Sequence, residues 1–235
     1  MMRLFRMFLA FVLCTCFLGV TLLVSCERVI FRLPYYEENY QKNGIAEYTG
    51  LPQEALTDTT VELLKYLRGE REDLSIEATA GGHKISVFSA DEQEHMVDVR
   101  AIVSKGYLLR NILLGVGIGA LFLIIFLSRR ASGWMKDFIR CYWIEFGIIS
   151  VLLAVIAIWS MVSFESIFLL FHRMSFSNML WMMDPADSLM IRMFPESFFL
   201  SMAMRIMATT AVFWVGGVVV SLVLWPIARR KKKRA

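Results

Sequence analysis

Four long apolar runs, separated by polar segments, dominate the pattern of hydrophobic and polar positions along the 235-residue chain. Each run offers about 16 to 22 apolar residues, near the roughly 20 that a helix needs to cross a hydrocarbon core of about 30 Å. Every backbone amide in that core must find a partner within its own segment, so the runs predict helices. They lie within residues 1–26, 107–128, 142–164 and 198–228.

Lysine and arginine cluster before the first run, between the second and third runs (129–141) and after the fourth run (229–235). Positive residues mark the cytoplasmic ends of membrane helices, and four crossings allow all three clusters to share one side. We therefore predict cytoplasmic termini, an extracellular head at 27–106 and an extracellular re-entrant or interfacial loop at 165–197. The head has 9 Lys and Arg against 15 Asp and Glu, a net charge of −6, which agrees with this topology.

Composition changes the picture in two places. Hydrophobic residues make up 57% of the chain, more than in an ordinary soluble domain. The basic tail has the composition of a nucleic-acid-binding segment. Its position directly after an apolar run favours anchoring at anionic phospholipid instead, so no nucleic-acid partner is expected.

The first run has an alternative interpretation as a cleaved signal segment. The stretch Leu23-Val24-Ser25-Cys26 has the look of a lipoprotein cleavage box. The run is longer than the apolar core of a usual signal peptide, and no flexible polar linker follows it. We expect a retained first span, with cleavage as the alternative.

The head combines helix and strand patterns. Residues Gln53–Arg68 place leucines on one stripe of an amphipathic helix, and Gly69 is a suitable stop. Two short strands are predicted at 74–79 and 84–88, with a tight glycine turn between them. Tyrosines around Pro34 are typical of an aromatic belt at the membrane interface. They are Tyr35, Tyr36, Tyr40 and Tyr48.

A helix is predicted to begin after Ser89. The stretch Ser89-Ala90-Asp91-Glu92 fits a capping box, in which the serine hydroxyl and the glutamate carboxylate pair with free backbone amides. That helix leads towards the second span, with Gly106 as a possible break. The chain therefore predicts an α-helical integral membrane protein with four transmembrane helices and a small α+β extracellular head.

Two of the three histidines fall next to predicted spans on the outer side. His95 lies on the helix before span two and His172 lies just after span three, whereas His83 sits in the glycine turn. Imidazole exchanges protons near neutral pH, so a pair of histidines can act as general base and general acid. A single interfacial histidine beside charges is more often merely solvated.

Three charged residues could support such a site. Asp98 is three residues after His95 and shares its helix face, so it could hold the imidazole tautomer. Glu165 is seven residues before His172 and could do the same there. Arg205, about two turns into span four, should face the bundle, towards Glu165 or a lipid headgroup. A purely structural pair between Glu165 and Arg205 is the alternative.

Several other chemistries lack a pattern. There is no GxSxG elbow, so the sequence does not indicate a serine nucleophile of that kind. There is also no CxxC and no HExxH, so it does not indicate a metal site. Ser163, Ser166 and Ser175 lie near His172 without a spacing that selects one. From the residues alone, we infer an outer, lipid-facing site that could carry out acyl or proton transfer by histidine.

Two stretches then suggest a family. FSADEQEHMVDVR, from Phe88 to Arg100, resembles an E-x-x-H-M-x-D-V-[KR] signature. FHRMSFSNMLWMMDPADSLMIRMFPESFF, from Phe171 to Phe199, resembles the F-H-x-x-x-F-x-N-x-x-W segment of the same family. Both resemble the bacterial family of four-span membrane proteins that includes the lipoprotein intramolecular transacylases of Gram-positive bacteria.

The resemblance implies an acyltransferase in the bacterial cell membrane, with its active site at the extracellular face. Such an enzyme moves the sn-2 acyl chain of a diacylglyceryl-modified lipoprotein to the α-amine of its N-terminal cysteine, giving a lyso-form lipoprotein. The essential histidines of the family correspond to His95 and His172, in roles that stay open. Asn178 and Trp181 are candidates for substrate binding or for fixing the loop. Ester-to-amide transfer is downhill, so no cofactor is expected.

The alternative function is a non-catalytic membrane adaptor whose head binds a partner protein. A transporter is less favoured, because the spans have few polar residues and no inverted repeat or broken helix pair.

Overall fold

The computed structural model describes residues 2–128 and 134–230. It separates into two compact units. The span unit comprises Met1–Glu27, Tyr107–Ile158 and Met204–Ala235, and the head unit comprises Arg28–Gly106 and Trp159–Ala203. Residues 129–133 of the predicted cytoplasmic loop and 231–235 of the basic tail lie outside the described residues.

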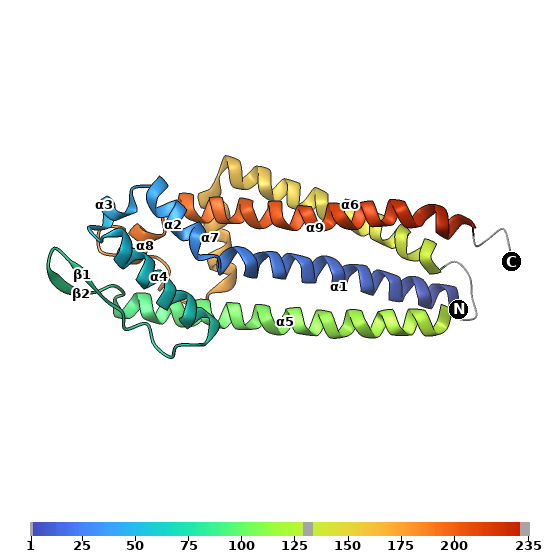
Figure 1. Ribbon diagram of the computed structural model, residues 1–235, viewed down its shortest axis with the longest axis horizontal. Helices are drawn as coiled ribbons and strands as arrows, with labels where there is room; N and C mark the ends of the chain where they lie inside the picture. Colours follow the sequence, from blue (N-terminus) through green and yellow to red (C-terminus); the bar gives the residue numbers. More distant parts are fainter. Residues whose placement is uncertain (1, 129–133, 231–235) are drawn as a thin grey trace. The chain divides into compact units, whose positions relative to one another are not determined.

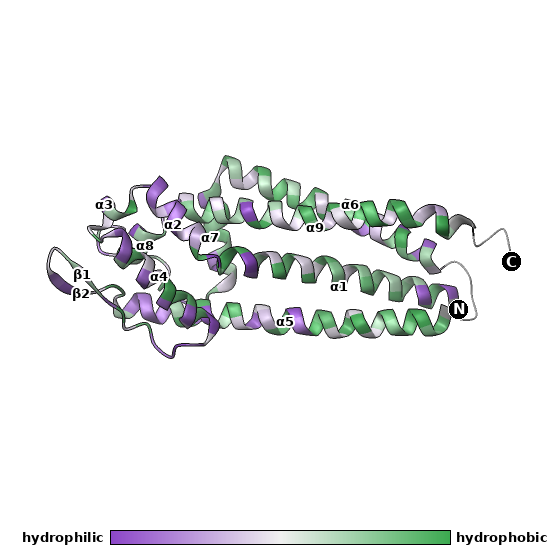
Figure 2. Cartoon of the chain, in the orientation of Figure 1, coloured by the Kyte–Doolittle hydropathy of each residue, from purple (hydrophilic) through white to green (hydrophobic). Residues whose placement is uncertain are grey.

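Four helices in the described ranges are long and apolar enough to cross a membrane (Figure 1). They are α1 (Met2–Ile30), α5 (Ala90–Ser128), α6 (Trp134–Val162) and α9 (Glu196–Arg230). Figure 2 shows long hydrophobic stretches on these helices and more hydrophilic residues on the shorter elements. The predicted fold class, an α-helical membrane protein with a small α+β part, is confirmed.

The span unit is held together by aromatic and polar contacts between α1, α6 and α9. Cys14 and Leu18 of α1 pack with Tyr142 of α6 and Trp214 of α9 in a buried cluster. The Tyr142 hydroxyl donates to the Trp214 carbonyl oxygen at 2.6 Å. The Trp214 indole Nε1 in turn donates to Thr21 Oγ1 at 2.8 Å. The polar tips of Tyr142 and Trp214 are thus both paired inside the bundle, which offsets the cost of burying them.

Helix α6 carries a buried acidic residue near the start of the third apolar run. Glu145 is buried, and its Oε2 accepts a hydrogen bond from Thr15 Oγ1 of α1 at 2.8 Å. Near the other end of this unit, Arg110 of α5 pairs with Glu27 of α1 and stacks over Tyr107. Polar groups in spans pair with one another in this way because hydrocarbon offers no alternative partner.

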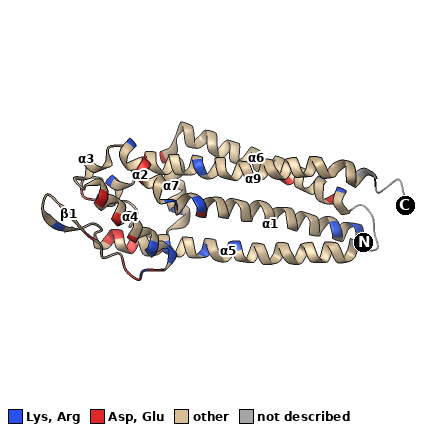
Figure 3. Ribbon diagram, in the orientation of Figure 1, with Lys and Arg blue, Asp and Glu red and all other residues tan. Residues whose placement is uncertain are grey.

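The head unit contains five short helices, a two-stranded sheet and the beginnings or ends of the long helices. The short helices are α2 (Leu33–Lys42), α3 (Ile45–Thr49), α4 (Gln53–Arg68), α7 (Phe164–Ser175) and α8 (Leu189–Met193). Antiparallel strands β1 (Glu77–Ala80) and β2 (His83–Ser86) pair Glu77 with Ser86 and Ala80 with His83. Figure 3 shows positions of acidic residues, in red, on α2, α4 and the start of α5.

The amphipathic helix and the hairpin of the head are confirmed. Helix α4 spans the predicted residues and ends at Gly69, whose φ of +82° is a left-handed conformation that suits glycine. The hairpin turns at Gly81 and Gly82, with φ values of 58° and 84°. The strands begin and end within three residues of the predicted bounds.

The capping box at the start of α5 is also confirmed. The Ser89 amide donates to Glu92 Oε2 at 2.6 Å, and the Glu92 amide donates to Ser89 Oγ at 3.2 Å. Helix α5 then continues without a break at Gly106. At about 1.5 Å per residue, its 39 residues extend about 58 Å, far beyond a 30 Å hydrocarbon core. One helix therefore supplies both a span and a wall of the head.

The interpretation of the tyrosines as an interfacial belt is wrong for three of them. Tyr35, Tyr36 and Tyr40 are buried in the head core, whereas Tyr48 is exposed. Their hydroxyls are paired: that of Tyr35 donates to the Phe198 carbonyl and that of Tyr36 to the Ile30 carbonyl. The rings of Phe194, directly after α8, and Phe198, in α9, pack against them, which composition alone does not reveal.

Candidate functional site

Two histidines from separate segments meet inside the head unit. His95 lies in the second turn of α5, and His172 lies in the last turn of α7. Their rings stack with centroids 6.3 Å apart and planes inclined by 24°. Both side chains are buried, at 6% and 8% exposure. The structure thus brings the two predicted catalytic residues together although 77 positions separate them in the sequence.

The tautomer of His172 follows from its hydrogen bond. Its Nδ1 lies 2.7 Å from the carbonyl oxygen of Phe168, one turn earlier on α7. A carbonyl oxygen can only accept, so Nδ1 must carry the proton. In the neutral ring, Nε2 is then left with a lone pair. The backbone of α7 therefore fixes His172 as a proton acceptor through Nε2.

Burial keeps both imidazoles neutral. It lowers the pKa of His95, because the charged form loses hydration, and the neighbouring His172 lowers it further while Asp98 opposes the change. Burial also lowers the pKa of His172, against the hydrogen bond to Phe168, which favours the charged form. An ordinary histidine has a pKa of about 6.5, so both rings are largely neutral at pH 7.

His95 differs from His172 in lacking an orienting hydrogen bond. In the described part of the chain, His95 Nδ1 is buried and has no hydrogen-bond partner. The prediction that Asp98 holds the His95 tautomer is therefore wrong. Asp98 lies on the same helix one turn later, but its Oδ2 accepts from Asn178 Nδ2 at 2.7 Å. Its carboxylate reaches across to the loop after α7 rather than back along α5.

Asn178 and Trp181 connect this carboxylate to His172. The Asn178 side-chain oxygen also accepts from the Leu180 amide, and the backbone carbonyl oxygen of Asn178 accepts from Trp181 Nε1 at 3.0 Å. The Trp181 ring lies 5.1 Å from the His172 ring between centroids. The two predicted substrate-binding residues therefore hold the loop against the histidine in this structure, and direct contact with substrate stays a prediction.

Glu165 does not orient His172, contrary to the prediction. It lies exposed in the first turn of α7, while the imidazole Nδ1 is taken by the Phe168 carbonyl. The carbonyl four residues earlier is nearer than a side chain two turns away. Arg205 lies in α9 within the span unit, whereas Glu165 belongs to the head unit. Their predicted pairing stays a prediction.

Exposed apolar side chains surround the end of α7. Four of them are more than half exposed, at 51% to 79%, and all lie within twelve residues of His172. They are Phe171, Met174, Met179 and Met182. Flexible methionines suit contact with hydrocarbon chains of varied shape. We call these four residues the methionine surface.

The family model for the lipoprotein intramolecular transacylase Lit matches residues 11–199. The chain belongs to the Lit family. The match includes α7 and α8 and both histidines. No curated protein matches the chain.

Solved structures of Lit from Bacillus cereus have the same fold. One is 18% identical over 98% of this chain and 99% of the other, with a TM-score of 0.71. Two further structures of Bacillus cereus Lit, each with one histidine replaced, by arginine or by alanine, are 19% identical with TM-scores of 0.67. They cover 98% of this chain and 94% or 96% of theirs. The likeness establishes that this Lit family member shares the membrane-integral fold.

Three residues shape the site of this Lit family member in ways that the sequence did not predict. Phe176 packs against both imidazoles, with centroids 4.9 Å from His95 and 5.5 Å from His172. Phe168 contributes the carbonyl, and its spacing of four from His172 was a readable signal on a helix. Ser188 donates to Glu92 Oε1 at 2.5 Å, joining α5 to the start of α8, and no spacing indicates that link.

Proposed function

We propose that this transacylase moves the sn-2 acyl chain of a diacylglyceryl-modified lipoprotein to the α-amine of its N-terminal cysteine. The observation that carries the proposal is the stacked and buried pair His95–His172, in which the hydrogen bond at Nδ1 leaves His172 Nε2 available as a base. Ester and amine belong to one substrate molecule. Holding them in line supplies much of the rate by effective molarity.

His172 takes the proton of the attacking amine. The neutral amine nitrogen attacks the ester carbonyl carbon, and His172 Nε2 accepts the N–H proton as the new C–N bond forms. The Phe168 carbonyl, held at Nδ1, favours the imidazolium that results.

His95 acts as the hydrogen-bond donor. A neutral imidazole N–H can donate to the oxyanion of the tetrahedral intermediate, where charge develops in a dry site. The C–O bond to the glyceryl group then breaks, and the proton held by His172 passes to the leaving alkoxide. The products are an N-acyl cysteine and a free glyceryl hydroxyl, so protons balance without a cofactor.

Unpartnered His95 Nδ1 supports this division of roles. A buried polar atom without a partner is rare in native structures and calls for a ligand or a task. The methionine surface supports a lipid substrate, since it offers apolar contact beside the imidazoles for acyl chains. We place the head and this site at the extracellular face, with both termini in the cytoplasm, on the charge sorting along the chain.

Lipoproteins from a host that lacks N-acylation provide the test. After expression of the chain there, mass spectrometry of N-terminal lipopeptides should show one acyl chain on the amine and one on the glyceryl group. His95→Ala and His172→Ala should abolish that product while the protein remains in the membrane. Unmodified lipoproteins together with a stable partner complex would instead favour the adaptor function.

A further inference from the structure

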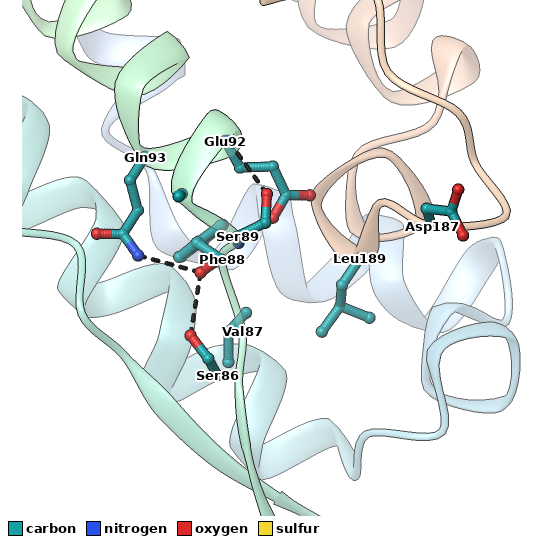
Figure 4. A pocket seen from close by; sticks show the side chains of 9 residues that line it. Ser86, Val87, Phe88, Ser89, Glu92, Gln93, Asp187 and Leu189 are labelled. Carbon is teal, nitrogen blue, oxygen red and sulfur yellow. Dashed lines mark hydrogen bonds between the residues drawn. The ribbon is translucent and has the colours of Figure 1, made fainter.

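A cavity of about 570 Å³ opens in the head unit beside the start of α5. Figure 4 shows its walls: residues 86–89, from the end of β2 to the start of α5, lie on one side, and Asp187 and Leu189, at the start of α8, lie on the other. Glu92 and Gln93 project from the first turns of α5. The volume is within the range of about 300 to 1,000 Å³ that is usual for ligand sites.

The cavity is close to the histidine pair along α5. Glu92 lines the cavity and precedes His95 by three residues, so the two lie on one face of the helix about 4.5 Å apart along its axis. Glu92 Oε1 also accepts from the Ser188 hydroxyl and the Met190 amide, which fixes the opposite wall. When the N-terminal cysteine of a lipoprotein reacts beside His95, the residues that follow this cysteine can therefore reach the cavity.

The lining suits a polypeptide better than an acyl chain. Val87, Phe88 and Leu189 form buried apolar surface, while Ser86 and Asp187 are exposed at the rim. The Asp187 carboxylate makes no hydrogen bond or ion pair within the described ranges. Apolar surface beside polar acceptors is what an extended peptide uses, through its side chains and its N–H groups.

An acyl chain has its own place elsewhere. The methionine surface lies on α7 and the loop that follows it, and its members do not line the cavity. Hydrocarbon gains nothing from the serine, glutamine and aspartate side chains around the cavity, because their hydration would be lost without a replacement. The two surfaces therefore divide a lipoprotein into its lipid and its protein parts.

We infer that this cavity binds the polypeptide that follows the acylated cysteine of the lipoprotein substrate. The inference rests on the proposed transacylation, and it names the part of the substrate recognised next to that site. An extended chain advances about 3.3 Å per residue, so roughly the second to fifth residues of the lipoprotein reach the cavity. Recognition through backbone and shape accepts many sequences and requires only an extended, accessible N-terminal segment.

Synthetic lipopeptides of two lengths test the inference on the purified full chain. One substrate carries a single residue after the diacylglyceryl cysteine, and the other carries six. We expect the longer substrate to have a KM roughly tenfold lower, with kcat nearly equal. Contacts distant from the reacting atoms stabilise the bound substrate and the transition state equally, so they lower KM alone. Ala90→Trp, which places an indole at the cavity lining, should remove that preference. Ala101→Trp, on an exposed position of α5 outside the lining, should retain it.

Photo-cross-linking gives a readout that does not depend on turnover. A benzophenone at the fourth residue of the lipopeptide should label residues 86–89 of the wild-type chain, and less so in Ala90→Trp. Equal KM values for the two substrates, or labelling only elsewhere, would overturn the cavity assignment while leaving transacylation intact. Absence of N-acyl product from either substrate would overturn the proposed function itself, and the inference with it.

Discussion

His172 Nδ1 lies 2.7 Å from the carbonyl oxygen of Phe168, one turn earlier on the same helix. This bond gives the two imidazoles different capabilities although their rings stack. His172 is fixed with a free lone pair at Nε2, whereas His95 Nδ1 has no partner in the described part of the chain. The backbone of α7, and not a carboxylate, therefore fixes the tautomer of His172, and the proposed roles of base and donor rest on this difference.

Glutamine substitutions should separate these two roles. A glutamine amide can donate a hydrogen bond but cannot act as a base near neutral pH. His172→Gln should lower kcat by about 10³-fold, since general base catalysis is lost. His95→Gln should lower it by only roughly tenfold, because a donor to the oxyanion remains. Single-turnover assays with one lipopeptide would measure both. The reverse order of activity would exchange the assigned roles.

The histidine pair should titrate below the ordinary range. Burial lowers the pKa of His172 and of His95, so each ring binds its proton only at a pH lower than that of an exposed histidine, about 6.5. The base form of His172 is then present at neutral pH, and catalysis by it is lost as the pH falls through the lowered value.

Imidazole NMR resonances would measure these values without interference from the titrating amine of the substrate. Single His→Gln variants assign the signals, since the chain has 3 histidines. A midpoint for His172 above 7 would contradict a neutral base at physiological pH.

The acid and the amide of the Asp98–Asn178 pair can be exchanged between the two positions by mutation. Their side chains share one hydrogen bond of 2.7 Å. Asn178→Asp should place two carboxylates together, lowering stability by roughly 2 kcal/mol and loosening Trp181 from His172. Asp98→Asn alone should be milder, because an amide oxygen still accepts. In the double variant, the new amide at position 98 donates to the new carboxylate at position 178, so the hydrogen bond is restored in the opposite direction.

Thermal unfolding and kcat, measured for the four members of this cycle, give the coupling between the two sites. Recovery in the double variant supports a positioning role for the pair. If Asn178→Asp and the double variant are equally impaired, Asn178 has another task, such as contact with the substrate.

Local patterns predicted much of the fold because the deciding interactions are local. The capping residues Ser89 and Glu92, the stop at Gly69 and the apolar stripe of α4 each act within a few positions of the chain. The four long helices follow from the lengths of the apolar runs, since a hydrocarbon core leaves the backbone few choices.

The supporting residues of the site were harder to predict because their partners are distant in sequence. Asp98 shares a helix face with His95, yet its carboxylate binds Asn178, 80 positions away. Tyr35 has the pattern of an interfacial residue, yet it is buried against Tyr36 and Phe198, the latter 163 positions away on α9. Periodicity identifies a face of a helix, but the group that covers that face is decided by tertiary packing.

Glu92 joins two segments that carry the site, and its loss should loosen both. Its Oε2 accepts from the Ser89 amide, while Oε1 accepts from the Ser188 hydroxyl and the Met190 amide. Glu92→Gln replaces one acceptor by an amide NH₂, so at least one buried donor loses its partner whichever way the amide turns. We expect the head to lose about 1 to 3 kcal/mol of stability.

Limited proteolysis of the loop before α8 would locate this loss of stability, and the apparent Tm in detergent would measure its size. Glu94→Gln is the matched control, because Glu94 is exposed on the same helix and makes no side-chain hydrogen bond within the described residues. Cleavage should be faster in Glu92→Gln than in Glu94→Gln. Equal cleavage and equal Tm would mean that packing alone holds α8 against α5, and the buried carboxylate would then need another explanation.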